Sequence, residues 1–152
     1  MSRAFVKETE GLDELHEKLV SEHRNLVTSE GLAFIEGEVK RLQDELAAAH
    51  AADDRNAIAR ATHDLRYWNQ RLGTAEVQPP AEDVSVVSFG SRVTLERNDG
   101  RIQKFQIVGE DEADPAKGSI SYVSPLAQAL MGKSVGDVVK AGVGEAEITK
   151  IE

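Results

Sequence analysis

Residues 32–75 read LAFIEGEVKRLQDELAAAHAADDRNAIARATHDLRYWNQRLGTA, and this stretch decides the fold. Two apolar stripes run through it, one on each side of a short polar turn at residues 51–56. Each stripe advances in alternating steps of three and four residues, which is the spacing of helices that pack side by side. The first stripe comprises Leu32, Ile35, Val39, Leu42, Leu46 and Ala49, and the second comprises Ile58, Ala61, Leu65, Trp68, Leu72 and Ala75.

A turn this short permits only an antiparallel pair. The sequence therefore predicts a helical coiled-coil hairpin over residues 28–77, with Thr28 or Ser29 as its N-cap and Asp53 and Asp54 at its tip. At about 22 residues per helix the hairpin would be roughly 33 Å long. Two helices bury one face only, which is typical of an arm held on a globular base. A hairpin packed against its own domain remains the alternative.

The second half has the pattern of a small α+β domain over residues 84–152. Pro79-Pro80 stops any helix and indicates a linker at residues 78–83, and Asn98-Asp99-Gly100 between two alternating runs predicts a hairpin. Residues 1–27 form an N-terminal extension, read either as a short helix or as a tail. We expect strands at residues 84–89, 92–97, 102–108, 119–123, 137–140 and 145–151, a solvated loop at 110–114, and a short helix at 125–131 that starts from Ser124.

Composition excludes several classes of function. The chain has 18 Lys and Arg against 27 Asp and Glu, a net charge of −9, so we expect no independent binding to duplex DNA. It has no cysteine, which excludes disulfides and thiolate chemistry. No apolar run reaches the ~20 residues of a membrane helix, and the first residues do not resemble a signal peptide. These features predict a cytoplasmic protein without a membrane partner.

A series of short matches runs in order along the chain, and together they resemble the Gre family of bacterial transcription factors. In that family a coiled-coil hairpin precedes a small FKBP-like α+β domain. The resemblance covers residues 27–152. The matching residues are Val27–Gly31, His63–Tyr67, Phe89-Gly90, Asn98–Gly100, Phe105–Gly109, Asp111-Glu112, Ile120-Ser121, Ser124–Leu130, Gly132-Lys133 and Val135–Asp137.

The resemblance implies that the partner is RNA polymerase. It places the docking surface at the loop before the short helix, which corresponds here to Val123, Ser124 and Pro125. It further implies that the arm enters the polymerase's secondary channel, where acids at the tip, here Asp53 and Asp54, help to hold a second Mg²⁺ while the polymerase cuts its own transcript. The factor would then be no enzyme and carry no cofactor of its own, and it would meet nascent RNA only inside the polymerase complex.

Two departures from the family pattern leave the mode of action open. The family's tip has a glutamate where this chain has Arg55, and each helix of the arm is roughly ten residues shorter, about 15 Å. One hypothesis is that Asp53 and Asp54 act as a displaced acid pair in transcript cleavage. The second, which these departures favour, is a non-cleaving competitor that occupies the channel mouth. A plain structural role for the two aspartates, in an exposed turn that caps the next helix, is an equal alternative.

A third hypothesis comes from a different class. FKBP-like domains include peptidyl-prolyl isomerases, which need an aromatic-lined pocket. The second half offers only Phe89, Phe105 and Tyr122 for such a pocket, so this hypothesis ranks below the other two.

Overall fold

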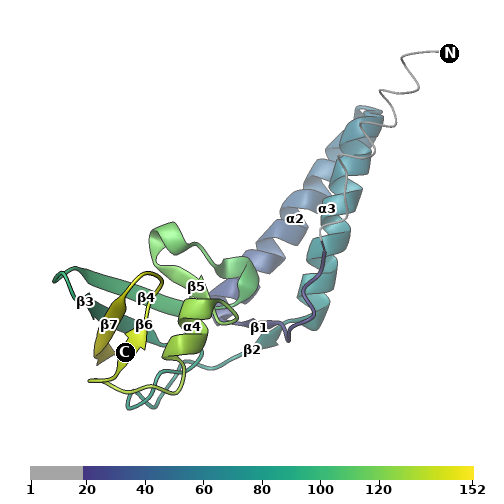
Figure 1. Ribbon diagram of the computed structural model, residues 1–152. Helices are drawn as coiled ribbons and strands as arrows, with labels where there is room; N and C mark the ends of the chain where they lie inside the picture. Colours follow the sequence, from purple (N-terminus) through teal and green to yellow (C-terminus); the bar gives the residue numbers. More distant parts are fainter. Residues whose placement is uncertain (1–18) are drawn as a thin grey trace. The chain divides into compact units, whose positions relative to one another are not determined.

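The computed structural model describes residues 19–152, and these fall into two compact units (Figure 1). The described part of the first, the arm unit, comprises residues 19–22 and 35–74. The second, the sheet unit, comprises residues 23–34 and 75–152. Most of the predicted N-terminal extension, residues 1–27, lies outside the described residues, and only its last nine positions are described.

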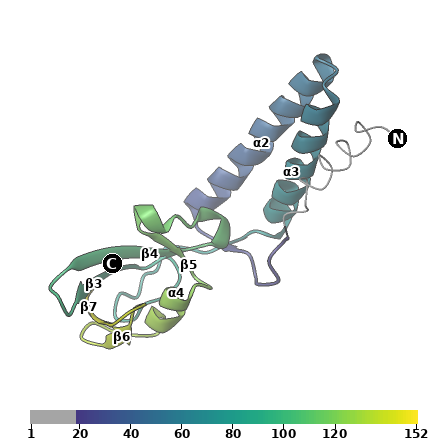
Figure 2. The same ribbon diagram turned by 45° about the horizontal axis from the view of Figure 1, so that its top comes forward.

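The predicted hairpin is present. Helix α2 spans Ser29–Ala51 and helix α3 spans Arg55–Thr74, so they contain 23 and 20 residues. At 1.5 Å per residue their lengths are roughly 34 and 30 Å. The two helices run side by side in opposite directions (Figures 1 and 2).

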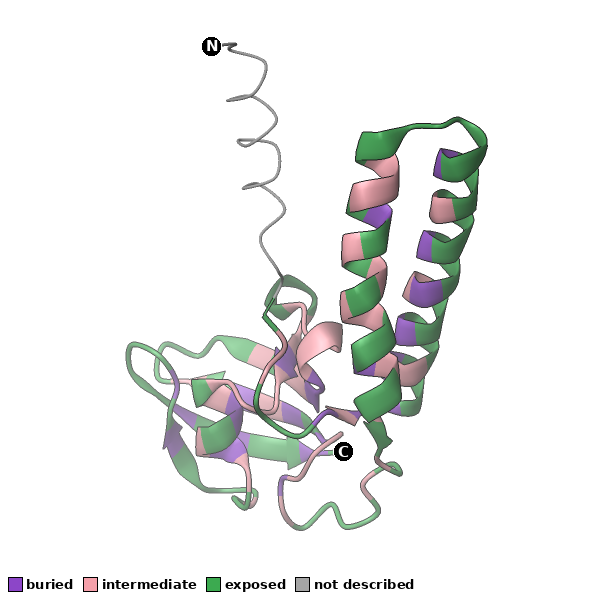
Figure 3. Ribbon diagram, turned by 90° about the vertical axis from the view of Figure 1, so that its right-hand side faces the viewer, coloured by how far each residue is buried: buried purple, intermediate pink, exposed green. Residues whose placement is uncertain are grey.

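The seam between the helices follows the first apolar stripe. Ile35, Val39, Leu42 and Ala49 are buried, and Ala61 of α3 is buried opposite them. Figure 3 shows that the buried positions of α2 lie on its inner side, toward α3. Leu46 and most residues of the second stripe are half-buried, because two helices alone cannot enclose both faces of a seam.

The sheet unit contains a five-stranded sheet with the order β5-β4-β3-β7-β6. β4 and β5 are parallel, and the other neighbours are antiparallel. The predicted hairpin joins β3 to β4: Gly100 adopts the left-handed conformation with φ 86°, and the Asp99 carboxylate accepts a hydrogen bond from the backbone of Arg101. The bounds are β3 Arg92–Arg97, β4 Ile102–Val108, β5 Ser119–Ser121, β6 Val138–Lys140 and β7 Glu145–Ile151.

One face of this sheet forms the core. Helix α4, Pro125–Leu130, contributes Ala127 and Leu130, both fully buried. The alternation of buried and exposed residues along β3 and β7 explains why these strands were recognisable in the sequence. The α+β class and the order of hairpin and sheet are confirmed. The strand members of the core are Val93, Leu95, Ile107, Ile120, Val139, Ala146, Ile148 and Ile151.

The strand predicted at residues 84–89 is wrong. The Asp83 carboxylate accepts hydrogen bonds from the backbone and hydroxyl of Ser85, which turns the chain away from an extended path. Val87 is the buried residue of this run, and it exchanges two backbone bonds with the loop after α4: its N–H donates to Lys133 and its carbonyl accepts from Gly132. An apolar run therefore fills the core here without entering the sheet.

The loop predicted at residues 110–114 also folds differently. Glu110–Glu112 form a 3₁₀ turn, η1, and Pro115–Lys117 form a second, η2. The sequence also gave no sign of a short parallel ladder between β1, Leu26–Val27, and β2, Glu76–Val77. This ladder joins the chain just before α2 to the chain just after α3. None of the helices in the described residues 19–152 is long and apolar enough to cross a membrane.

Candidate functional site

The arm tip is a tight turn of three residues between α2 and α3. The N–H groups of Asp53 and Asp54 donate to the carbonyls of His50 and Ala49, at 3.1 and 3.0 Å, and so close the end of α2. Asp53 has a positive φ of 51°, a conformation that aspartate tolerates better than most residues. The turn thus brings the two predicted site residues together in an exposed position.

Asp54 caps the start of helix α3 at this turn. Its Oδ1 accepts a hydrogen bond from the N–H of Ala57 at 3.2 Å, and its carbonyl accepts from Ile58 at 2.9 Å. This is the geometry of an N-cap, which stabilises a helix by about 1 kcal/mol. The capping role that the sequence left open is therefore present for Asp54.

The tip does not form a metal site by itself. Mg²⁺ requires near-octahedral oxygen ligation, whereas among residues 19–152 no group of three or more Asp, Glu, His or Cys side chains is placed to hold a cation. Asp53 and Asp54 could supply one or two oxygens to an ion held by another protein. Arg55 follows them directly, and its charge opposes a cation at that point.

The predicted docking loop leads into α4. Ser124 is the N-cap of this helix, and its Oγ accepts a hydrogen bond from Ala127 N at 3.3 Å. Its own N–H donates to the carbonyl of Ser121 at 2.9 Å, and Val123 N donates to the Ser121 hydroxyl at 3.2 Å. Pro125 occupies the first turn and is exposed. The loop is thus a fixed conformation that presents Pro125 to solvent.

Tyr122 precedes this loop, and the sequence indicated it only as an aromatic residue for an isomerase pocket. Its ring packs edge-on against Phe89, with 5.5 Å between ring centres and 75° between planes. Its hydroxyl donates to the backbone carbonyl of Arg24, and its own carbonyl accepts from Gln128 Nε2 at 2.7 Å. The sequence showed an aromatic residue here but could not show a partner 98 positions away.

Glu112 was missed as a functional residue, although it belongs to the loop predicted at residues 110–114. Its carboxylate accepts hydrogen bonds from the N–H groups of Thr28 and Gly109, each at 3.0 Å, and from the Thr28 hydroxyl. The Thr28 Oγ1 accepts in turn from Gly31 N at 2.9 Å, so Thr28 is the N-cap of α2. A carboxylate at this position also suits the positive end of the helix dipole.

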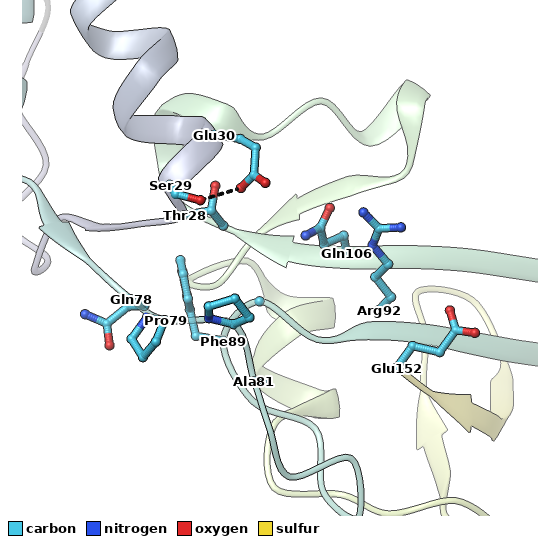
Figure 4. Close-up of a pocket in the computed structure, with 12 residues that line it drawn as sticks. Thr28, Ser29, Glu30, Gln78, Pro79, Ala81, Phe89, Arg92, Gln106 and Glu152 are labelled. Atoms are coloured by element: carbon cyan, nitrogen blue, oxygen red, sulfur yellow. Dashed lines mark hydrogen bonds between the residues drawn. The ribbon is translucent and has the colours of Figure 1, made fainter.

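A pocket of about 370 Å³ lies in the sheet unit beside the start of α2 (Figure 4). Polar and apolar groups share its walls, and the Glu30 carboxylate at its edge accepts a bond from the Ser29 hydroxyl. Hydrogen bonds from Glu30's own backbone N–H and then from Ser29 hold the pKa of the Glu30 carboxyl below its usual range. The lining residues are Thr28–Glu30, Gln78–Ala81, Phe89, Gly90, Arg92, Gln106 and Glu152.

This pocket does not favour the isomerase hypothesis. Of the three aromatic residues that the hypothesis required, Phe89 lies along the pocket. Phe105 and Tyr122 do not line this pocket, and all three aromatic residues pack against the core of the sheet unit.

Comparison with known proteins relates the chain to one family of transcription factors. The family model described as "Transcription elongation factor, GreA/GreB, C-term" matches residues 81–152. The chain is 35% identical to the transcription elongation factor GreA of Sphingopyxis alaskensis, over 98% of both proteins. It is 34% identical to GreA of Desulfovibrio desulfuricans, over 91% of this chain and 83% of that protein. The crystal structure of GreA factor homolog 1 of Thermus thermophilus is 25% identical, with a TM-score of 0.42 over 86% of this chain and 99% of that one.

A helical hairpin followed by this small sheet domain, with these relatives, defines a transcription elongation factor. The chain belongs to the GreA/GreB family. It is accordingly a transcription factor and not an enzyme in its own right. The sequence predicted a resemblance over residues 27–152. The alignments with the two GreA proteins cover more of the chain than that range.

Proposed function

We propose that the chain binds RNA polymerase in the cytoplasm and regulates elongation by placing its arm in the secondary channel. Membership of the GreA/GreB family supports the choice of partner. An exposed two-helix arm supports the mode of entry, because a narrow hairpin with a polar outer surface suits insertion into a water-filled channel.

The proposed docking surface is Val123, Ser124 and Pro125. Three observations support it: the loop is held in one conformation by its bonds to Ser121, Pro125 is exposed, and α4 behind it is anchored in the core. A loop that is ordered before binding loses little conformational entropy when it docks.

Two modes of action at the channel remain. In the first, Asp53 and Asp54 add oxygens to a second Mg²⁺ that the polymerase holds, and that ion would activate a water for cleavage of the transcript. In the second, the arm occupies the channel mouth and excludes other factors without promoting cleavage. In either mode, contact with nascent RNA occurs only within the polymerase complex.

The structure of the tip favours the second mode, which we propose for this chain. The single observation that carries the choice is the hydrogen bond from Ala57 N to Asp54 Oδ1, since it commits one of the two carboxylates to capping α3. The adjacent Arg55 and the predicted shortness of the arm argue in the same direction.

Binding can be tested by size-exclusion chromatography with core RNA polymerase. The intact chain should co-elute with the enzyme, and a variant with Ser124→Ala and Pro125→Ala should bind at least tenfold more weakly. Loss of the cap should lower stability by about 1 kcal/mol, which leaves the protein folded. A variant with Val143→Ala and Glu145→Ala, at exposed positions where the chain turns into β7, serves as the control. Undiminished binding by a folded Ser124/Pro125 variant would remove this loop as the docking surface.

A further inference from the structure

Tyr122 stands immediately before the proposed docking loop, and its position is fixed from several sides. Its N–H donates to the carbonyl of Val108 at 2.9 Å, its carbonyl accepts from the Gln128 side chain, and its ring rests against Phe89. All these contacts lie in the sheet unit. They fix the ring, and they would be the same for a phenylalanine.

The hydroxyl group reaches a different part of the chain. It donates to the backbone carbonyl of Arg24, in the segment that leads through β1 into α2. The Arg24 guanidinium then binds both carboxylate oxygens of Glu76, the first residue of β2, with N–O distances of 3.2 and 2.8 Å. The hydroxyl thus connects the docking loop to the chain on both sides of the arm.

The first of these segments is also held at Thr28, by the bonds to the Glu112 carboxylate, and a short ladder joins the two segments to each other. The ladder between β1 and β2 contains two residues in each strand, and its backbone bonds include those from Glu76 N to Asn25 O and from Gln78 N to Val27 O, each at 2.8 Å. Ladders this short are marginal in water. The side chains of Arg24 and Glu76 are 71% and 43% exposed, and exposed ion pairs contribute little to stability.

We infer that Tyr122 is a positioning residue: through its hydroxyl it keeps the two chain segments that border the arm attached beside the polymerase-docking loop. Its role in regulation rests on the proposed function, whereas the local attachment does not. Docking through Ser124 and Pro125 would then be conveyed to these two segments by one hydrogen bond and the ion pair behind it.

The local attachment is tested without polymerase by hydrogen exchange in a Tyr122→Phe variant, which keeps the ring. The backbone amides of Glu76 and Gln78 should exchange about fivefold faster, the factor that corresponds to the usual net contribution of one hydrogen bond. The amide of Gly136, which donates to Ile148 in the sheet, should be unchanged. Tyr67→Phe removes the other tyrosine hydroxyl of the chain and should leave Glu76 and Gln78 at wild-type rates. Wild-type exchange at these two amides in Tyr122→Phe would overturn the inference.

The functional role is tested by titrating the intact variant against elongating polymerase. If the Tyr122 hydroxyl acts through these two segments, the concentration for half-maximal binding should stay within about twofold of wild type, while the maximal effect on elongation falls several-fold. A parallel change in both quantities, together with a lower melting temperature, would show a merely structural role and overturn the inference. An unchanged maximal effect of the variant on elongation would also overturn the inference. Failure of the wild-type chain to bind polymerase would contradict the proposed function instead, and the exchange result would still decide whether the attachment exists.

Discussion

The carboxylate of Glu112 holds the first turn of α2 by accepting hydrogen bonds from both the backbone N–H and the hydroxyl of Thr28. Residues 23–34 belong to the sheet unit, so α2 begins inside that unit and only later enters the arm unit. A polar contact between residues 84 positions apart therefore holds the start of α2 within the sheet unit.

Removal of this contact should destabilise the sheet unit. Glu112→Ala leaves the N–H groups of Thr28 and Gly109 without their acceptor, and the expected loss is about 2 to 3 kcal/mol. Urea denaturation measures it. Glu145→Ala, on an exposed position of β7, should change stability by less than about 0.5 kcal/mol and serves as the control. Equal effects of the two substitutions would show that Glu112 does not stabilise the start of α2.

Two glycines of α2 should respond oppositely to alanine. A Cβ at Gly31 would overlap the Glu112 carboxylate and push it from its partners, so Gly31→Ala should cost about 1 to 2 kcal/mol. A Cβ at Gly37 meets nothing within 4 Å, so Gly37→Ala should stabilise the helix by about 0.5 to 1 kcal/mol. The melting temperatures of the two variants should move in opposite directions. In a Glu112→Ala background, Gly31→Ala should no longer be costly, and a persistent penalty there would point to another cause.

The packing of α2 against α3 can be tested by placing one charged side chain between the two helices. Leu42 is 1% exposed, and Leu42→Asp should cost about 3 to 5 kcal/mol because the carboxylate has no partner in the seam. Far-ultraviolet circular dichroism should report a loss of helix, while the amide spectrum of the five-stranded sheet persists. Gln43→Asp places the same charge on the exposed neighbour and should leave helicity nearly unchanged. Equal helicity in the two variants would contradict the paired-helix interpretation.

The Arg24–Glu76 contact should depend on pH. The hydrogen bond from Arg24, followed by the charge of that side chain, lowers the pKa of the Glu76 carboxyl. Because the folded pKa lies below the unfolded value, the contact is fully present above the ordinary pKa of a glutamate and is lost as pH falls through the folded value. A carbon-detected NMR titration of Glu76 should give a pKa below that measured in an Arg24→Gln variant. Identical values would show that the pair does not form in solution.

The sequence predicted those parts of the fold that depend on local periodicity. The stripe from Ile35 to Ala49 and the turn at Asn98-Asp99-Gly100 both carry their structure within a few residues, and both were predicted correctly. The run at residues 84–89 has the composition of a strand. Its conformation is instead determined by the backbone hydrogen bonds of Val87 with Gly132 and Lys133 in the loop after α4, and no local pattern indicates these partners.

The same difference between local and distant partners explains which residues of the candidate site could be predicted. Ser124 as a helix cap was predictable, because a cap and its helix are adjacent in sequence. Glu112 and Tyr122 act on Thr28 and Arg24, far away along the chain, so a single sequence shows an acidic and an aromatic residue without their partners. Whether Asp53 and Asp54 serve a metal in a complex stays a prediction.

We propose that this arm occupies the secondary channel of RNA polymerase without promoting cleavage. The most direct measurement is the release of short 3′ RNA fragments from backtracked elongation complexes, with and without a cleavage-active GreA competitor. The wild-type chain should release no fragments and should suppress those released by the competitor, and a variant with Asp53→Asn and Asp54→Asn should behave in the same way. Efficient release by the wild-type chain that disappears in the double variant would contradict the account and assign the two aspartates to the second Mg²⁺ site.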